Sequence, residues 1–349
     1  MESNALRVMI KKILLSVVLI VMQFQLFGQN KYYTNPVSDT VFIADPFVLN
    51  HEGIYYLYGT TASSRGFQYC TSKNLVDWQP GGFAYERIEN SWGQTNFWAP
   101  EVIFYKDQFY LIYSAVGQTM FGNGLRLCLA VSDKPTGPFV DLYAPLFDLG
   151  YSCIDGHIFL DDGTPYLYYE MVGSVGEFRK NDGFLWGYIF GVELSPDLSG
   201  IKNEPTLCLY PSQEWEGINS MKARSNEGMT VFKNNNTYYI TYSGNHYEDP
   251  NYGVGYATAS KPLGMWTKSE HNPILKQDIP NKVSGPGHNS IIKSPDNSEW
   301  FIIYHSHASL THPNHVRILN IDRLKFLPDG SLKVHGPTRT PQLYPTGAQ

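Results

Sequence analysis

The chain repeats one pattern of aromatic and β-branched residues five times between residues 54 and 304. Each copy is a run of five residues without a charged side chain, which is typical of a buried strand. A turn-like polar stretch precedes most of the runs, for example Asp161-Asp-Gly-Thr164, while Lys106-Asp107 fills this place less clearly in the second repeat. The runs are Ile54–Tyr58, Phe109–Tyr113, Pro165–Tyr169, Thr237–Thr241 and Trp300–Tyr304.

A second predicted strand precedes each turn, so each repeat opens with a β-hairpin. Further short strands follow, and no amphipathic helix of ten or more residues is evident after residue 29. Strand units that recur about every 50 to 70 residues are typical of a β-propeller, which arranges four-stranded blades around a central channel. We therefore predict an all-β, five-bladed β-propeller. Two stacked β-sandwiches are the alternative, but they would not explain a repeating hairpin of one type. The preceding strands are 41–49, 101–105, 154–160, 229–233 and 290–293.

The composition agrees with a large β-sheet core. Aromatic residues make up 15% of the chain, including 25 Tyr, and charged residues only 17%, where about 25% is usual. The net charge of −6 is mild, and no basic run appears after the first dozen residues. These features exclude nucleic acid as an expected partner, because its binding depends on clustered Lys and Arg.

The first 29 residues differ from the rest of the chain. Arg7, Lys11 and Lys12 precede a mostly apolar run over 13–27, a pattern that predicts a secretory signal peptide over 1–29. The run is short for a membrane-spanning helix, which needs about 20 apolar residues. An uncleaved anchor is the alternative. We therefore expect one catalytic propeller domain over 30–349, exported to the periplasm or the extracellular space, without a stable membrane partner after cleavage.

Five ionisable residues stand eight to twelve positions before the aromatic strands of the five repeats. The innermost strand of each blade borders the channel, so these side chains are expected at equivalent positions round one mouth of it. A single Asp before a strand is more often a turn residue, but that explanation fits five coincidences poorly. Gathered carboxylates repel one another, a cost usually tolerated for catalysis or cation binding. The five residues are Asp45, Glu101, Asp155, Glu227 and His288.

Clustered carboxyl groups beside aromatic residues suit glycoside hydrolysis. That reaction needs one protonated carboxyl to give a proton to the leaving oxygen and one ionised carboxylate that acts on water or on the sugar. A third negative neighbour can keep the acid protonated, because like charges raise its pKa. Residue chemistry alone leaves open which members of the cluster take these parts.

Short motifs around these residues resemble glycoside hydrolase family 43, in the clan of five-bladed propeller glycosidases. The resemblance runs in family order across residues 36 to 330, and carbohydrate is the partner it implies. The matching motifs include Ala44-Asp-Pro46, Trp98-Ala-Pro-Glu101, Ile154-Asp155, Asn226-Glu-Gly228, Gly287-His-Asn-Ser290 and the stretch 317–324.

The resemblance implies an inverting mechanism, with Asp45 as general base, Glu227 as general acid, and Asp155 raising the pKa of Glu227 and orienting it. Trp98 matches an aromatic residue that lines the sugar pocket, and Arg317 an arginine that contacts the sugar.

His288 matches the family's channel histidine, which lies beside calcium or the substrate, so calcium is the candidate cofactor. Glu101 receives no catalytic role and is expected to line the channel or support the fold. Gly156-His157 and Met229 stand where the family more often has Pro, and the first departure could bring His157 near the site.

The resembling family acts mainly on α-L-arabinofuranosides and β-D-xylosides, with arabinan and galactan activities also represented. We expect an exo-acting α-L-arabinofuranosidase that acts on side chains of plant-type polysaccharides or oligosaccharides. A β-D-xylosidase, or an enzyme active on galactan or galactofuranosides, is the alternative.

Two rival functions come from other classes of protein. A non-catalytic glycan-binding propeller would have no need of three intact carboxyl groups. A metal-dependent hydrolase would use His305, His307, His312 and His315, but a catalytic zinc needs three protein ligands in one place. Cysteine spacing fits no zinc template, so we expect small buried residues, with a disulfide not required. The cysteines are Cys70, Cys128, Cys153 and Cys208.

Overall fold

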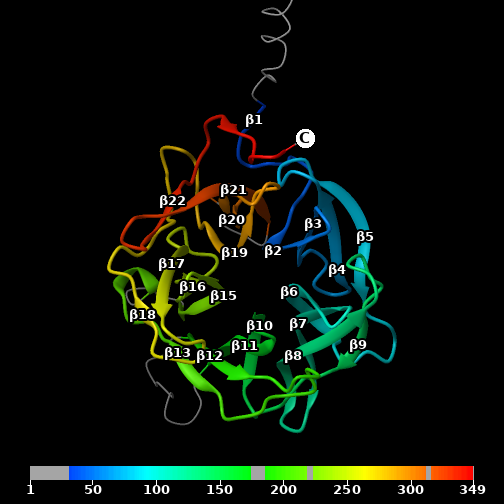
Figure 1. The fold of residues 1–349 in the computed structure, drawn as a ribbon. Coiled ribbons are helices and arrows are strands. Elements are labelled where there is room, and N and C mark those ends of the chain that lie inside the picture. Colours follow the sequence, from blue (N-terminus) through cyan, green and yellow to red (C-terminus); the bar gives the residue numbers. More distant parts are fainter. Residues whose placement is uncertain (1–30, 174–184, 218–222, 312–315, 349) are drawn as a thin grey trace, which may run out of the picture.

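The computed structural model describes residues 31–173, 185–217, 223–311 and 316–348. The predicted five-bladed β-propeller is confirmed, since five antiparallel sheets stand round one axis (Figure 1). The innermost strands contact one another in a closed ring that runs β2 (Ala44–His51), β6 (Thr95–Tyr105), β10 (Ser152–Asp161), β15 (Asn226–Asn234), β19 (Gly287–Lys293) and back to β2. Within the described ranges no helix has the length and apolarity needed to cross a membrane. The predicted signal peptide, His312 and His315 lie outside these ranges.

Each blade consists of four consecutive strands, ordered from the axis outwards. The third blade carries one additional short strand, β14 (Ala223–Arg224), which pairs in parallel with β12. The strands are β2–β5 (Ala44–His51, Ile54–Thr60, Gly66–Ser72, Gln79–Glu86), β6–β9 (Thr95–Tyr105, Gln108–Thr119, Gly122–Ser132, Val140–Tyr143), β10–β13 (Ser152–Asp161, Thr164–Val172, Leu185–Glu193, Thr206–Leu209), β15–β18 (Asn226–Asn234, Thr237–Gly244, Gly253–Ala259, Thr267–Lys268) and β19–β22 (Gly287–Lys293, Trp300–His307, Arg317–Phe326, Leu332–His335).

The aromatic strand of each repeat is buried on both faces, which explains why it shows no polar alternation. In β3, Tyr55 and Leu57 pack into a hydrophobic cluster shared with the last blade. Tyr56 and Tyr58 point the other way, into a cluster shared with the second blade. Every blade is thus held between two neighbours. The four cysteines are free, and three of them are buried, as expected for small core residues.

The two ends of the described chain meet and close the ring. Strand β1 (Tyr32–Tyr33) pairs with β23 (Gln342–Leu343). The segment before β2 also follows the last blade, since the amide of Ile43 donates to the carbonyl of Arg317. These pairings fasten the first blade to the last, and Figure 1 shows β1 beside the C-terminal segment.

Every innermost strand carries a β-bulge near its start, where the pairing register with the second strand shifts. One residue of each bulge has a left-handed backbone, with φ between 44° and 56°. A bulge bends the strand and redirects the side chain at that point. The five left-handed residues are Asp45, Ala99, Asp155, Gly228 and His288.

These bulges correct the expectation that the five ionisable residues are equivalent. Asp45, Asp155 and His288 do occupy the same bulge position, but Glu227 lies one residue before it. Glu101 lies two residues after the corresponding Ala99. Four of the five hairpins have the same two-residue turn, and only the turn between β19 and β20 is longer. A spacing of eight to twelve residues was therefore too loose a criterion to identify the bulge position.

Candidate active site

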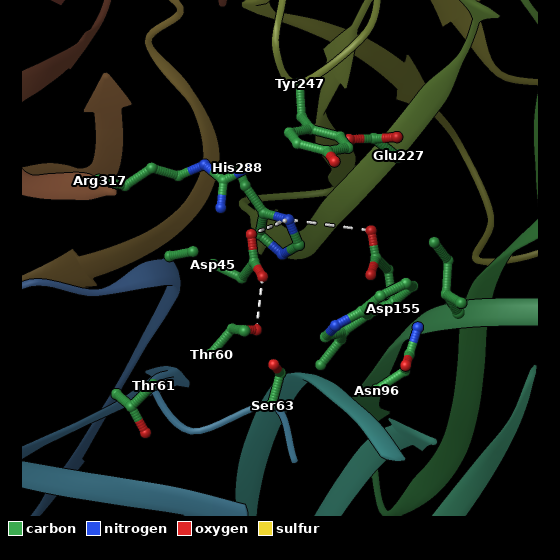
Figure 2. Close-up of a pocket in the computed structure, with 13 residues that line it drawn as sticks. Asp45, Thr60, Thr61, Ser63, Asn96, Asp155, Glu227, Tyr247, His288 and Arg317 are labelled. Carbon is green, nitrogen blue, oxygen red and sulfur yellow. Dashed lines mark hydrogen bonds and ion pairs between the residues drawn. The ribbon is translucent and has the colours of Figure 1, made fainter. Parts of the chain in front are cut away.

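A cavity of about 400 Å³ lies at the start of the innermost strands. It brings together all six residues predicted for the site, namely Asp45, Trp98, Asp155, Glu227, His288 and Arg317. Figure 2 shows the Asp45, Asp155 and His288 side chains pointing toward one another, with Glu227 beside Tyr247. The remaining lining residues are Ala44, Thr60, Thr61, Ser63, Asn96, Ile154 and Tyr247.

Asp45 is held by contacts to both oxygens of its carboxylate. The Thr60 hydroxyl donates to Oδ2 at 2.6 Å and itself accepts the amide hydrogen of Ala99 at 2.9 Å. Because that amide occupies a lone pair of Thr60, the hydroxyl hydrogen is free to point at Asp45. The other oxygen, Oδ1, lies 3.2 Å from Nδ1 of His288. These contacts fix the carboxylate, which keeps 18% of its side chain exposed.

His288 lies between two carboxylates. Its Nδ1 is 3.2 Å from Oδ1 of Asp45 and 3.8 Å from Oδ2 of Asp155. Burial alone would lower the pKa of this imidazole, but the charges of Asp45 and Asp155 outweigh that effect and raise it. A cationic His288 would offset part of the repulsion among the carboxylates.

The Asp155 side chain is connected directly to the backbone that carries Glu227. Its Oδ2 accepts the amide hydrogen of Gly228 at 3.0 Å. Burial raises the pKa of Asp155 to about 7, and the charges of Glu227 and Asp45 act in the same direction against the opposing effect of His288. Asp155 can therefore influence Glu227 both by charge and by position.

Glu227 receives a hydroxyl group at each of its oxygens. The Tyr252 hydroxyl donates to Oε1 at 2.7 Å, and Oγ of Ser225 lies 3.2 Å from Oε2. Removal of its carboxyl from water raises the pKa of Glu227, and the charge of Asp45 adds to this, despite the hydrogen bond from Tyr252. The arrangement supplies a carboxyl that retains its proton above the ordinary glutamate pKa of about 4.3.

Arg317 and two aromatic residues complete the cavity. The Arg317 guanidinium lies 4.8 Å from the ring centroid of Tyr247. Its buried Nε has no hydrogen-bond partner among the described residues, although guanidinium nitrogens are strong donors. Trp98 supplies an apolar ring to the lining of the cavity. Donors and rings of this kind suit a hydroxyl-rich ligand.

Glu101 and His157 do not line the cavity. They form a buried pair, with Nδ1 of His157 2.6 Å from Oε2 of Glu101. Nε2 of His157 accepts the amide hydrogen of Val231 on β15 at 3.0 Å, so Nδ1 carries the hydrogen. The structural role expected for Glu101 agrees with this pair, whereas His157, which the departure from the family pattern could have brought near the site, does not line the cavity. Its ring is engaged by β6 and β15 instead.

The two described histidines of the metal-hydrolase alternative, His305 and His307, are also hydrogen-bonded. Nδ1 of His305 accepts the amide hydrogen of Asp45 at 3.0 Å. His307 contacts the Ser284 hydroxyl and the carbonyl of Tyr247. In the part of the chain that the structure describes, no group of three or more His, Cys, Asp or Glu is arranged to hold a metal ion. Calcium prefers oxygen ligands, so a histidine facing carboxylates does not by itself form its site.

The gathering of three carboxyl groups in the cavity of a propeller indicates a glycosidase. Comparison of the sequence with known protein families identifies the family. The chain belongs to the glycosyl hydrolases family 43, whose family model matches residues 33–332. It is therefore a glycoside hydrolase that acts on carbohydrate substrates. The predicted family resemblance and enzyme class are confirmed.

Individual relatives differ in the activities that their names record. The chain is 27% identical to a β-D-galactofuranosidase of Aspergillus niger over 83% of this chain and 81% of that enzyme. It is 25% identical to an arabinoxylan arabinofuranohydrolase of Bacillus subtilis, of which it covers 63%. Among solved structures, a thermostable family-43 glycoside hydrolase is 48% identical with a TM-score of 0.84, over 90% of this chain and 99% of that one.

Proposed function

We propose that the chain is an inverting, exo-acting α-L-arabinofuranosidase that removes side chains from plant-type polysaccharides or oligosaccharides. The gathering of Asp45, Asp155 and Glu227 in one cavity, with the pKa of Glu227 raised, is the observation that supports it most. The cavity of about 400 Å³ is near the lower end of the range for small-molecule sites, about 300–1,000 Å³. That size suits one terminal sugar better than a length of polymer.

In the proposed reaction Glu227 gives its proton to the leaving oxygen as the glycosidic C–O bond breaks. Water attacks the anomeric carbon from the opposite face and gives its proton to Asp45, so the configuration inverts. In its ionised form Asp155 opposes loss of the Glu227 proton by like-charge repulsion, and it holds the Gly228 amide in place. Trp98 would pack against the sugar, and Arg317 would donate hydrogen bonds to its hydroxyl groups.

A β-D-galactofuranosidase is the second candidate, favoured by the relative from Aspergillus niger. The two sugars share the same ring configuration, and galactofuranose has one additional CHOH group in its exocyclic chain. A pocket built for arabinofuranose therefore needs only a little more depth to accept galactofuranose. A β-D-xylosidase requires a six-membered ring and remains the third candidate, since other relatives are named xylosidase/arabinosidase.

A panel of aryl glycosides tests this assignment. We expect turnover of the α-L-arabinofuranoside to exceed that of the β-D-galactofuranoside and the β-D-xyloside. Proton NMR of the first product should show the β-anomer before mutarotation. A retained α-anomer would exclude inversion, and preference for another sugar would replace the substrate assignment. Sugar binding without hydrolysis of any glycoside would favour the non-catalytic glycan-binding alternative.

Chelation tests the calcium expectation. Because the residues round His288 do not form a calcium site by themselves, we expect kcat to be unchanged after dialysis against EDTA. A loss of activity that calcium restores would show that the ion is required, and one that only zinc restores would favour the metal-hydrolase alternative.

We also propose that residues 1–29 direct export and are then removed, leaving the propeller in the periplasm or outside the cell. The basic and apolar segments of this stretch support the proposal. Mass spectrometry of the secreted protein would locate the mature N-terminus, and a chain retained in the membrane with residues 1–29 intact would contradict it.

A further inference from the structure

Glu170, near the end of β11, departs from a rule that the other four blades follow. In each of those blades the second strand presents a side chain that accepts the bulge amide hydrogen of the next blade. Glu170 holds the corresponding register position in the third blade, opposite Ile154. The four acceptors are Thr60 for Ala99, Ser114 for Asp155, Ser243 for His288 and His305 for Asp45.

By this rule Glu170 would accept the amide hydrogen of Gly228, but Asp155 accepts it instead. Gly228 N–H donates to Oδ2 of Asp155 at 3.0 Å. Glu170 turns instead toward Ser225, whose Oγ lies 2.7 Å from Oε1 of Glu170. This exchange allows Asp155 to reach the backbone next to Glu227. It also places the Glu170 carboxyl one residue removed from Glu227, with the Ser225 hydroxyl between them.

Glu170 is almost completely buried, with 2% of the residue exposed. Its Oε2 has no hydrogen-bond partner among the residues that the structure describes. The pocket is built closely round this side chain, since any side chain at Gly187 would collide with both Glu170 and Ser225. An ionised carboxylate with one bare oxygen in such a place would be very costly.

The number of hydrogens available at Ser225 also indicates that Glu170 is protonated. Its Oγ lies 2.7 Å from Glu170 and 3.2 Å from Oε2 of Glu227, but a serine hydroxyl has one hydrogen to donate. Both contacts are hydrogen bonds only if one carboxyl is protonated and donates to Ser225. Glu227 must release its proton in each catalytic cycle. Only Glu170 can therefore donate a hydrogen bond to Ser225 during the whole cycle.

We propose that Glu170 is a permanently neutral positioning residue that donates to Ser225, which in turn donates to Glu227 once that acid has lost its proton. This inference rests on the proposed role of Glu227 as the general acid. Glu170 would thereby stabilise the carboxylate formed at the transition state and hold its orientation. It touches no substrate, and its influence passes through Ser225.

The charges round Glu170 agree with a neutral side chain. The charged groups that act on its pKa are Glu227 on β15 and Asp155 on β10, both carboxyls, and together with burial they raise it well above the ordinary value. The Arg224 guanidinium on β14 lies over the Trp186 ring, 5.2 Å from its centroid, and is not among the groups that shift the pKa of Glu170.

Two substitutions of Glu170 separate a neutral hydrogen-bonding role from the alternatives. Glu170→Gln keeps the shape, the neutrality and a donor toward Ser225, so kcat and the basic limb of its pH profile should match the wild type. Glu170→Leu removes the donor. We expect kcat to fall by roughly two- to tenfold, the factor that a hydrogen bond between neutral groups is worth, with KM little changed. The basic limb should move to higher pH, because Ser225 loses the donor that holds its hydroxyl hydrogen toward the Glu227 carboxylate.

Ser225→Ala provides a smaller change that should shift the basic limb in the same direction if Glu170→Leu does not fold. A basic limb that moves to lower pH in Glu170→Gln would overturn the proposal, since it would mean that a negative charge had been removed. Wild-type behaviour of both Glu170→Leu and Ser225→Ala would overturn it as well.

Infrared difference spectroscopy tests the protonation of Glu170 without reference to activity. The wild type minus Glu170→Gln spectrum should contain the C=O band of a protonated carboxyl at a pH where surface carboxyls are ionised. The absence of that band would refute neutrality at Glu170. If the band is present but Glu227→Gln leaves hydrolysis intact, the assignment of the general acid fails instead, and the two failures remain distinguishable.

Discussion

Replacing Asp45 with Asn is expected to lower kcat by roughly 10²- to 10⁴-fold, the usual contribution of one general base. The amide cannot take the proton of the attacking water, but its oxygen can still accept the Thr60 hydroxyl. Asn also tolerates the left-handed backbone at this bulge, where φ is 53°. The loss should therefore appear in kcat rather than in KM or in the melting temperature, and steady-state kinetics with calorimetry measures all three.

Glu52 offers a matched control for this substitution. It is also a carboxylate with a left-handed backbone, φ 51°, but it lies in the turn at the far end of the same hairpin. Glu52→Gln should leave kcat within about twofold of the wild type, as expected for an exposed surface change. If Asp45→Asn retained more than about a tenth of the wild-type kcat, well above the range for a lost base, the assignment of Asp45 would be wrong.

The fold could be predicted from the sequence because each blade needs one strand that is apolar on both faces. Packing between adjacent sheets imposes that requirement on Tyr55–Tyr58 and on the four related runs, and the runs recur with the blades. Local chemistry within about fifteen residues was enough to recognise each hairpin. The number of blades followed from the number of runs.

The sequence did not reveal which residue of each innermost strand occupies the equivalent bulge position. A β-bulge shifts the register by one residue, and this decides whether a side chain enters the cavity. Glu101 looked equivalent to Asp45 by its distance from the next aromatic strand, yet Ala99 holds that position. The family motifs, rather than the spacing, distinguished Glu101 from the three carboxyls that line the cavity.

Supporting residues were missed because their contacts join distant parts of the chain. Ser225 meets Glu170 across 55 residues, and Tyr252 reaches Glu227 from 25 residues further along. In the sequence Thr60 looks like an ordinary residue at the end of a strand, so its hydrogen bond to Asp45 was not predicted. Glu170 alone carried a signal, since it is a carboxylate that directly follows the apolar run Pro165–Tyr169 inside a strand. An unpaired charge in a buried strand is costly, and such a residue is a functional candidate.

Replacing Glu227 with Gln is expected to produce a loss that depends on the leaving group. A glycoside with a sugar or alkyl leaving group needs the acid proton and should lose roughly 10²- to 10⁴-fold in kcat/KM. A dinitrophenyl glycoside, whose leaving group departs as a stable anion, should lose far less. Gln can still accept from Tyr252, so the local geometry is expected to persist.

The pH profile of the same variant provides the second half of this test. The raised pKa of Glu227 predicts that wild-type activity persists while the acid is protonated and falls as the pH rises through that value. Gln has no proton to lose, so the basic limb assigned to Glu227 should disappear from the residual activity on the activated substrate. Equal losses on activated and unactivated substrates, with the basic limb retained, would move the acid role to another carboxyl. Asp155 would then be the first to test, because its pKa is raised to about 7 in the same cavity.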